Sequence, residues 1–296
     1  MSDARVQSSM NPLDVALEDV LAVALQAGEL ILAMQADGLR NITSKSSEID
    51  LVTEADVAAE RLIRSELAAR YPAVELWGEE SNQPPSGDLF WVVDPIDGTI
   101  NFAGGLPYFA VNIALQAGEQ TVLGVTLELP ARRLYFARRG EGAFRRDLDG
   151  REQRLRVNAA STLRRALLTT GFPYSRAEFA DNNLPEFSYF MAHSMGVRTM
   201  GSAAMDLVNV ASGGMAAYWE SWLNPWDAAP GVVLVAEAGG RVTDYRGAPW
   251  QLTKRTLVAS NGQPDLHQAL LDGIRTARQG LSRPLLPAEE TGDCVL

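Results

Sequence analysis

Apolar residues recur at helical spacing in the first seventy residues of the chain. The segment Leu13–Met34 is largely apolar and predicts a long helix, and Thr53–Ala69 predicts a second one. In the second segment one apolar stripe follows a helical period, and it consists of Ala59, Leu62, Ile63 and Leu67. Residues 1–12 are polar, and we expect them to be flexible.

Between Phe109 and Phe144 the pattern changes to short β-rich runs. These runs are Val111–Leu115, Thr121–Leu129 and Leu134–Ala137, and Gly118 and Pro130 lie between them. Such runs, separated by turn residues, favour an antiparallel meander. Upstream, the apolar run Leu89–Val93 predicts a buried strand, which Pro95 is expected to end.

After a polar break at residues 147–152, predicted strands and helices alternate. The strands are Ala166–Thr170, Met215–Trp219 and Leu257–Ala259, and the helices are Ala203–Ala211, Trp226–Ala238 and Pro264–Thr276. This alternation favours a mainly parallel sheet. The predicted fold class is therefore α/β, a layered αβαβα sandwich. An α+β subdomain with an antiparallel sheet would span residues 13–150, an α/β subdomain residues 151–278, and a disordered tail residues 279–296.

Composition narrows the class of protein. Apolar residues make up 46% of the 296 residues, enough for a sizeable core, and the formal net charge is −11. No basic run is long enough to follow a nucleic-acid backbone, so we expect no direct nucleic-acid binding. The single cysteine, Cys294, excludes an internal disulfide. Without a membrane-spanning stretch or a signal sequence, the expected location is cytoplasmic.

The most informative chemistry lies where the Leu89–Val93 strand is expected to end. Asp94 and Asp97 would share one short loop, close enough to bind the same hard cations. Gly98 permits a tight turn, which leaves the amides of Gly98 and Thr99 free to meet an anion. Carboxylates for metal beside amides for phosphate are what metal-assisted phosphoryl chemistry needs.

Four further acidic sites accompany this loop, and each also has a purely structural interpretation. Asp56 follows Thr53 in a capping-box pattern, and Asp227 fits the preference for acids in the first turn of a helix. Glu79, in the segment 78–81, could be an ordinary solvated loop residue. Glu220 lies close to two tryptophans and is either partnered or functional. Because these sites occur together and in this order, we favour the functional interpretation over the structural one.

The motifs carry a family resemblance. Residues 94–102 resemble the central signature of the inositol monophosphatase family of magnesium-dependent, lithium-sensitive phosphatases. Residues 226–231, followed by 237–240, resemble its C-terminal signature, and residues 50–56, 78–81 and 201–204 resemble three further blocks. The resemblance runs roughly from Leu13 to Ile274, and Ile100 departs from it by replacing a residue that is polar in many members.

This resemblance implies a role for each matching residue. Two or three Mg²⁺ ions would be bound by the carboxylates and one main-chain carbonyl of Glu79, Asp94, Ile96, Asp97 and Asp227. Asp56 and Thr99 would orient and help to deprotonate the attacking water. Substrate contacts would come from Asp97, Gly98, Thr99, Gly201, Ser202, Ala203, Glu220 and Asp227. The resemblance also implies a homodimer.

The implied function is hydrolysis of a small phosphorylated polyol by metal-activated water, with inositol 1-phosphate as the leading candidate. No side-chain nucleophile is needed, and His193 and His267 are expected to be structural or surface residues. Fructose 1,6-bisphosphate, histidinol phosphate, NADP and 3′-phosphoadenosine nucleotides remain alternatives, the nucleotides disfavoured because no additional basic pocket is evident. A regulatory role through a protein partner stays open. A catalytically inactive homologue is disfavoured, since every metal position retains a competent residue.

Overall fold

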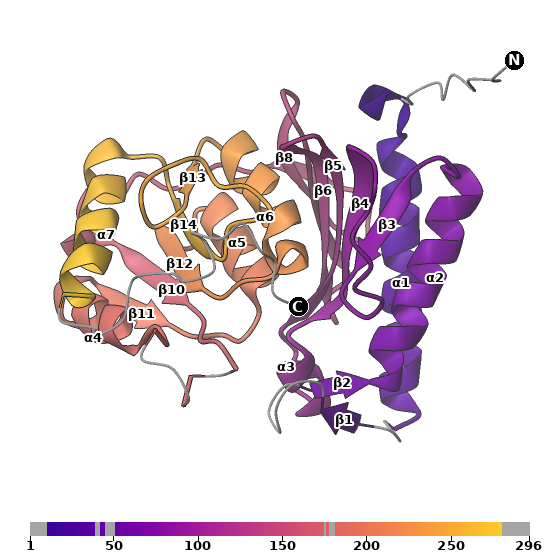
Figure 1. The fold of residues 1–296 in the computed structure, drawn as a ribbon, viewed down its shortest axis with the longest axis horizontal. Helices are drawn as coiled ribbons and strands as arrows, with labels where there is room; N and C mark the ends of the chain where they lie inside the picture. Colours follow the sequence, from indigo (N-terminus) through magenta and orange to yellow (C-terminus); the bar gives the residue numbers. More distant parts are fainter. Residues whose placement is uncertain (1–10, 39–41, 45–50, 175, 178–180, 280–296) are drawn as a thin grey trace, which may run out of the picture.

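The computed structural model describes residues 11–38, 42–44, 51–174, 176–177 and 181–279. The predictions for residues 1–10, for Asp50 and for the tail from residue 280 lie outside this part of the chain. The described residues form alternating layers of helices and sheets, in the order helices, sheet, helices, sheet, helices (Figure 1). The predicted layered α/β sandwich is therefore confirmed.

The first helical layer consists of α1 (Leu17–Ala36) and α2 (Glu54–Arg70). Helix α1 begins later than predicted because Pro12–Asp14 form a separate 3₁₀ turn. Helix α2 begins after Thr53, whose hydroxyl accepts the N–H of Ala55. Both helices bury their apolar stripes, Val20 and Ile63 among them, against Trp91 and Ile113 of the adjacent sheet.

That sheet has seven strands in chain order. They are β3 (Glu75–Gly78), β4 (Leu89–Asp97), β5 (Phe109–Ala117), β6 (Gln120–Leu129), β7 (Arg133–Arg138), β8 (Gly142–Arg146) and β9 (Glu152–Arg154). Strands β4 to β9 form an antiparallel meander, as predicted, and β3 pairs with β4 in parallel. Strands β1 (Ile42–Ser44) and β2 (Leu51–Thr53) form a separate ladder.

Strand β4 does not end at Pro95, so that prediction was wrong. Asp94 is paired with Asn112 and Asp97 with Ala110, so three steps along β4 match two along β5. The extra residue makes a β-bulge, which accommodates a proline that has no N–H to donate. In a regular strand, residues three apart face opposite sides of the sheet. The bulge instead allows Asp94 and Asp97 to turn toward the same place.

The second sheet has the order β11-β10-β12-β14-β13. Its strands are β10 (Leu167–Thr170), β11 (Gly196–Arg198), β12 (Ala217–Ser221), β13 (Arg241–Thr243) and β14 (Thr256–Ser260). The expectation of a mainly parallel sheet was wrong. Strand β10 pairs in parallel with β11 and β12, whereas β14 pairs antiparallel with β12 and β13. A loop rather than a crossover helix joins β13 to β14, and this connection gives an antiparallel pair.

Helices cover both faces of the second sheet. Helices α5 (Ala203–Ala211) and α6 (Pro225–Glu237) lie between the two sheets, and α4 (Leu184–His193) and α7 (Pro264–Ala277) cover the outer face (Figure 1). His193 is exposed at the end of α4, and His267 is buried in α7 between the hydroxyls of Thr243 and Ser260. In the described part of the chain, no helix is both long and apolar enough to cross a membrane.

Candidate active site

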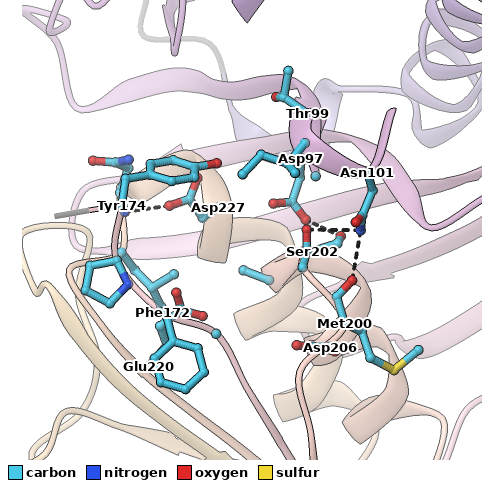
Figure 2. A pocket seen from close by; sticks show the side chains of 18 of the residues that line it. Asp97, Thr99, Asn101, Phe172, Tyr174, Met200, Ser202, Asp206, Glu220 and Asp227 are labelled. Carbon is cyan, nitrogen blue, oxygen red and sulfur yellow. Dashed lines mark hydrogen bonds between the residues drawn. The ribbon is translucent and has the colours of Figure 1, made fainter. Parts of the chain in front are cut away.

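A cavity of about 680 Å³ is lined by residues from both sheets. Its walls come from the turn between β4 and the short helix α3 (Thr99–Ala103), the segment before α5, the end of β12 and the start of α6 (Figure 2). Of the twelve site residues implied by the sequence, eleven line this cavity, and the twelfth is Asp56. The structure thus brings together side chains from positions 79 to 227 of the chain.

Three carboxylates form the centre of the cavity. One oxygen atom from each of Asp94, Asp97 and Asp227 lies within 4.8 Å of the others. Asp94 and Asp97 come from the bulged end of β4, and Asp227 from the first turn of α6, where it accepts the N–H of Asn224 at 2.7 Å. Glu79 lines the same cavity, and its main-chain N–H donates to the carbonyl of Val93, which precedes Asp94, at 3.1 Å.

The electrostatics of this cluster favour a bound cation. Burial, followed by the charges of Glu79, Asp97 and Asp227, raises the pKa of Asp94. Burial also raises the pKa of Asp227, and it raises that of Asp97 to about 6. None of the ion pairs between described residues involves Asp94, Asp97 or Asp227. Buried like charges without a cationic partner are unfavourable, and their oxygen atoms are the ligands that Mg²⁺ prefers. The donor set therefore fits magnesium.

Hydrogen bonds at Asp97 join the two halves of the cavity. The Ser202 hydroxyl donates to Oδ2 of Asp97 (Figure 2). The main-chain N–H of Ala204 donates to the same oxygen at 2.8 Å. Close by, Nδ2 of Asn101 donates to the carbonyl of Met200 at 2.8 Å. The segment before α5 is thus fixed against the turn that carries Asp97.

Gly98 directs the chain from β4 into α3. Its φ is +92°, and a Cβ atom added there would lie 3.1 Å from the carbonyl oxygen of Gly201. Glycine is the residue that adopts this left-handed conformation without steric cost. Because Gly98 and Thr99 begin a helix, their amides have no partner within it. They lie beside the carboxylate cluster, where they can donate to an anion.

Asp56 serves two structural purposes at once. Its Oδ2 accepts the N–H and hydroxyl of Thr53 at 2.8 and 2.5 Å, which makes the capping box expected from the sequence. Its Oδ1 faces the Thr99 hydroxyl at 3.4 Å, and that hydroxyl also donates to the carbonyl of Ile96 at 3.0 Å. Asp56 reaches the cavity through Thr99 rather than directly.

Glu220 lies at the far side of the cavity from Thr99 (Figure 2). Its Oε2 accepts the hydroxyl of Tyr218 at 2.5 Å, whereas the indoles of Trp219 and Trp222 donate to other groups. Burial raises the pKa of Glu220 to about 7. A Cβ atom at Gly171 would lie 2.1 Å from Oε2, so only glycine leaves room for this carboxylate.

The sequence did not predict several of the residues that line the cavity. Asp206, which is 1% exposed, accepts the Tyr108 hydroxyl at 3.2 Å. It lies in the first turn of α5, where an acidic residue is common because it interacts favourably with the helix dipole. Arg176 and Arg255 also line the cavity, so basic groups that were not evident in the sequence accompany the site. They lie far apart in the chain, so no basic cluster marks them in the sequence.

Comparisons with known proteins agree with this geometry. The model of the inositol monophosphatase family matches residues 13–279. An inositol-1-monophosphatase of Synechocystis sp. is 38% identical over 90% of this chain and 90% of its own. A Pseudomonas aeruginosa protein named Nus factor SuhB is 39% identical over 83% of this chain and 91% of its own.

A solved structure from Staphylococcus aureus, inositol monophosphatase II with inositol monophosphate bound, has a TM-score of 0.73 and 28% identity. The similarity covers 89% of this chain and 96% of that one. The same protein is also known with 2′-AMP bound.

Proposed function

The chain belongs to the inositol monophosphatase family of phosphatases, and we propose that it is a Mg²⁺-dependent enzyme that hydrolyses a small phosphorylated polyol. Inositol 1-phosphate is the leading candidate substrate. The observation that carries this proposal is the cluster of buried Asp94 with the largely buried Asp97 and half-buried Asp227, whose carboxylate oxygens lie within 4.8 Å of one another. The amides of Gly98 and Thr99, beside it, provide for the phosphate.

Each group in the cavity has a part in the proposed reaction. Glu79, Asp94, Asp97, Asp227 and the carbonyl of Ile96 would hold two or three Mg²⁺ ions. When bound, Mg²⁺ neutralises charge on the phosphate oxygens and lowers the pKa of coordinated water.

Groups of the chain itself would bind the phosphate and orient the attacking water. The amides of Gly98 and Thr99 bind the phosphate, which fixes the direction of attack. The Thr99 hydroxyl would turn its single proton from the Ile96 carbonyl, 3.0 Å away, to Oδ1 of Asp56, 3.4 Å away, and accept a hydrogen bond from the attacking water. Asp56 can thereby take up the proton that the water loses.

The opposite wall of the cavity offers hydrogen-bond acceptors to the leaving alcohol. Glu220 and Asp206 place carboxyl groups there, and Ser202 lies between Asp206 and Asp97 (Figure 2). Ala203 also lines the cavity. Acceptors of this kind suit a polyol because each hydroxyl can donate one hydrogen bond. The Staphylococcus aureus relative with inositol monophosphate bound supports this choice.

A second candidate substrate carries a further anionic group. Arg176 and Arg255 line the cavity, and no described carboxylate forms an ion pair with either. The Staphylococcus aureus relative bound to 2′-AMP supports the inclusion of nucleotides and bisphosphates in any screen.

A panel of phosphate esters tests the proposal. The purified protein is incubated with inositol 1-phosphate, fructose 1,6-bisphosphate, histidinol phosphate and 2′-AMP, and released phosphate is measured with Mg²⁺ and with a chelator. We expect Mg²⁺-dependent release, fastest from inositol 1-phosphate. Release that persists in the chelator, or no release from any ester, would contradict the proposal.

Membership of the family supports three further proposals: inhibition by lithium, a homodimer and a cytoplasmic location. The relative named Nus factor SuhB also supports a search for a protein partner. Light scattering after size exclusion measures the oligomeric state. Affinity capture with wild-type protein, compared with capture by Asp94→Asn, asks whether any partner needs the intact site.

A further inference from the structure

Glu60, one turn after Asp56 on α2, contacts the turn that carries Glu79. Its side chain is 4% exposed and does not line the cavity. Oε2 of Glu60 accepts the main-chain N–H of Glu80 at 2.7 Å, and Oε1 accepts that of Ser81 at 3.2 Å. The carboxylate therefore holds the backbone directly after Glu79.

The same carboxylate also touches the backbone before Glu79. A Cβ atom added at Gly78 would lie 2.3 Å from Oε2 of Glu60, so a side chain there would displace the carboxylate. Glu79 itself donates its N–H to the carbonyl of Val93, next to Asp94. The turn is thus fixed by Glu60 on one side and by β4 on the other.

Arg64, one further turn along α2, orients Glu60. Its Nη2 donates to Oε1 of Glu60 at 3.1 Å and to the Ser81 hydroxyl at 2.6 Å, and its Nη1 donates to the carbonyl of Leu76 at 3.1 Å. The guanidinium balances the charge of the buried carboxylate and binds both ends of the same turn. Residues 56, 60 and 64 follow one another at intervals of four and share one side of the helix.

We propose that Glu60 is a positioning residue for metal binding, which acts by holding the backbone of residues 78–81 so that Glu79 points into the cavity. The inference rests on the proposed function, in which Glu79 is a metal ligand. Helix α2 would then set the water-positioning group Asp56 and the ligand Glu79 in a fixed relation. Groups that orient metal ligands typically change metal affinity or activity about 10- to 100-fold when they are removed.

The experiment compares Glu60→Gln with Glu66→Gln as a matched control. Glu66 lies on the same helix, and among the described residues its one ion-pair partner is exposed Arg70. Mg²⁺ binding is measured by calorimetry on the metal-free proteins, and phosphate release is measured against Mg²⁺ concentration. Glu60→Gln should weaken Mg²⁺ binding about tenfold and shift the activity curve by the same factor. The kcat at saturating Mg²⁺ should change less, and Glu66→Gln should match wild type.

A folded Glu60→Gln protein that binds Mg²⁺ as tightly as wild type would overturn the proposal. If Glu60→Gln does not fold, Arg64→Gln replaces it, because Arg64 is 37% exposed and less sensitive to substitution. Arg64→Gln should give a smaller loss of Mg²⁺ affinity in the same direction, and unchanged affinity in that variant would also refute the role. Wild-type protein that binds no Mg²⁺ would instead reject the proposed function together with this inference.

Discussion

Replacing Glu220 by Gln tests the proposal that this carboxylate recognises hydroxyl groups of the substrate. A carboxylate has about four acceptor sites. The Tyr218 hydroxyl and the main-chain N–H of Gly171 use some of these in Glu220, and the rest are open to a ligand. Glutamine keeps the size of the side chain but turns one oxygen into an NH₂ group, which cannot accept. Selectivity for a polyol phosphate should therefore fall, while Mg²⁺ affinity stays unchanged.

The size of the effect follows from the interaction that is lost. A hydrogen bond to a charged group contributes about 1.5–3 kcal/mol, so kcat/KM for inositol 1-phosphate should fall roughly 10- to 100-fold. For phenyl phosphate, whose leaving alcohol has no further hydroxyl, kcat/KM should hardly change. Since the pKa of Glu220 is raised to about 7, the ionised acceptor predominates only above that pH. The wild-type preference for inositol 1-phosphate should thus weaken below pH 7, and that of Glu220→Gln should not.

The assay measures kcat/KM for both esters from pH 6 to pH 8.5, together with the melting temperature. Tyr218→Phe is the matched control, because it removes a hydrogen bond to Glu220 but leaves the acceptor in place. If Glu220→Gln lowers the melting temperature while the ratio of the two kcat/KM values stays at the wild-type level, then Glu220 only satisfies Tyr218 and the reasoning fails.

Four further outcomes are expected. Asp56→Asn should keep its melting temperature, because the amide oxygen of Asn can still accept the hydrogen bonds of Thr53 in the capping box, but kcat should fall roughly 10²–10⁴-fold; full activity would leave Asp56 with the capping box as its only role. In the absence of metal, Asp94→Asn should melt at a higher temperature than the wild type, because one buried like charge is gone. Mg²⁺ should not raise the melting temperature of this variant, and thermal melts of both proteins with and without Mg²⁺ test both expectations. Millimolar Li⁺ should inhibit in a way that added substrate does not relieve, as initial rates over a substrate series will show. Burial lowers the pKa of His267 to about 4 from 6.5, so the folded state should lose up to about 3 kcal/mol of stability as the pH falls from 6.5 to 4. Urea unfolding at pH 7 and pH 4.5 should show this loss of stability in the wild type and not in His267→Asn.

The sequence predicted those parts of the fold that depend on local periodicity. The apolar stripe of α2, with Ile63 and Leu67, marked the helix because the stripe and the buried face are the same residues. The direction of β14 could not be predicted in this way, since it depends on the connection from β13 rather than on either strand. Pro95 misled for a related reason: the pairing of β4 with β5 continues past the proline by means of a bulge.

The residues of the candidate site differ in the same way in how well the sequence predicts them. Its carboxylates were found because each stands in a recognisable short motif, such as Asp94 and Asp97 around Pro95. Asp206 and Arg255 belong to no such motif and reach the cavity only through the fold. In the sequence Glu60 is one polar position on an amphipathic helix, and the main-chain groups that it binds are about twenty residues away. Buried polar contacts between distant segments are what a single sequence conceals.

The bulge in β4 has a consequence for how this chain can change over time. Asp94 and Asp97 share one cavity because one residue more passes along β4 than along β5. What the site requires between them is therefore a number of steps that suits the pairing with β5, more than any particular side chain. Substitutions at the two intervening positions should leave both aspartates in place. A single-residue insertion beside the intact bulge would turn one aspartate to the opposite face of the sheet, whereas a deletion that removes the bulge would restore regular pairing, in which residues two apart share a face. The segment should therefore tolerate exchange of residues, and even loss of the bulge, better than an added residue.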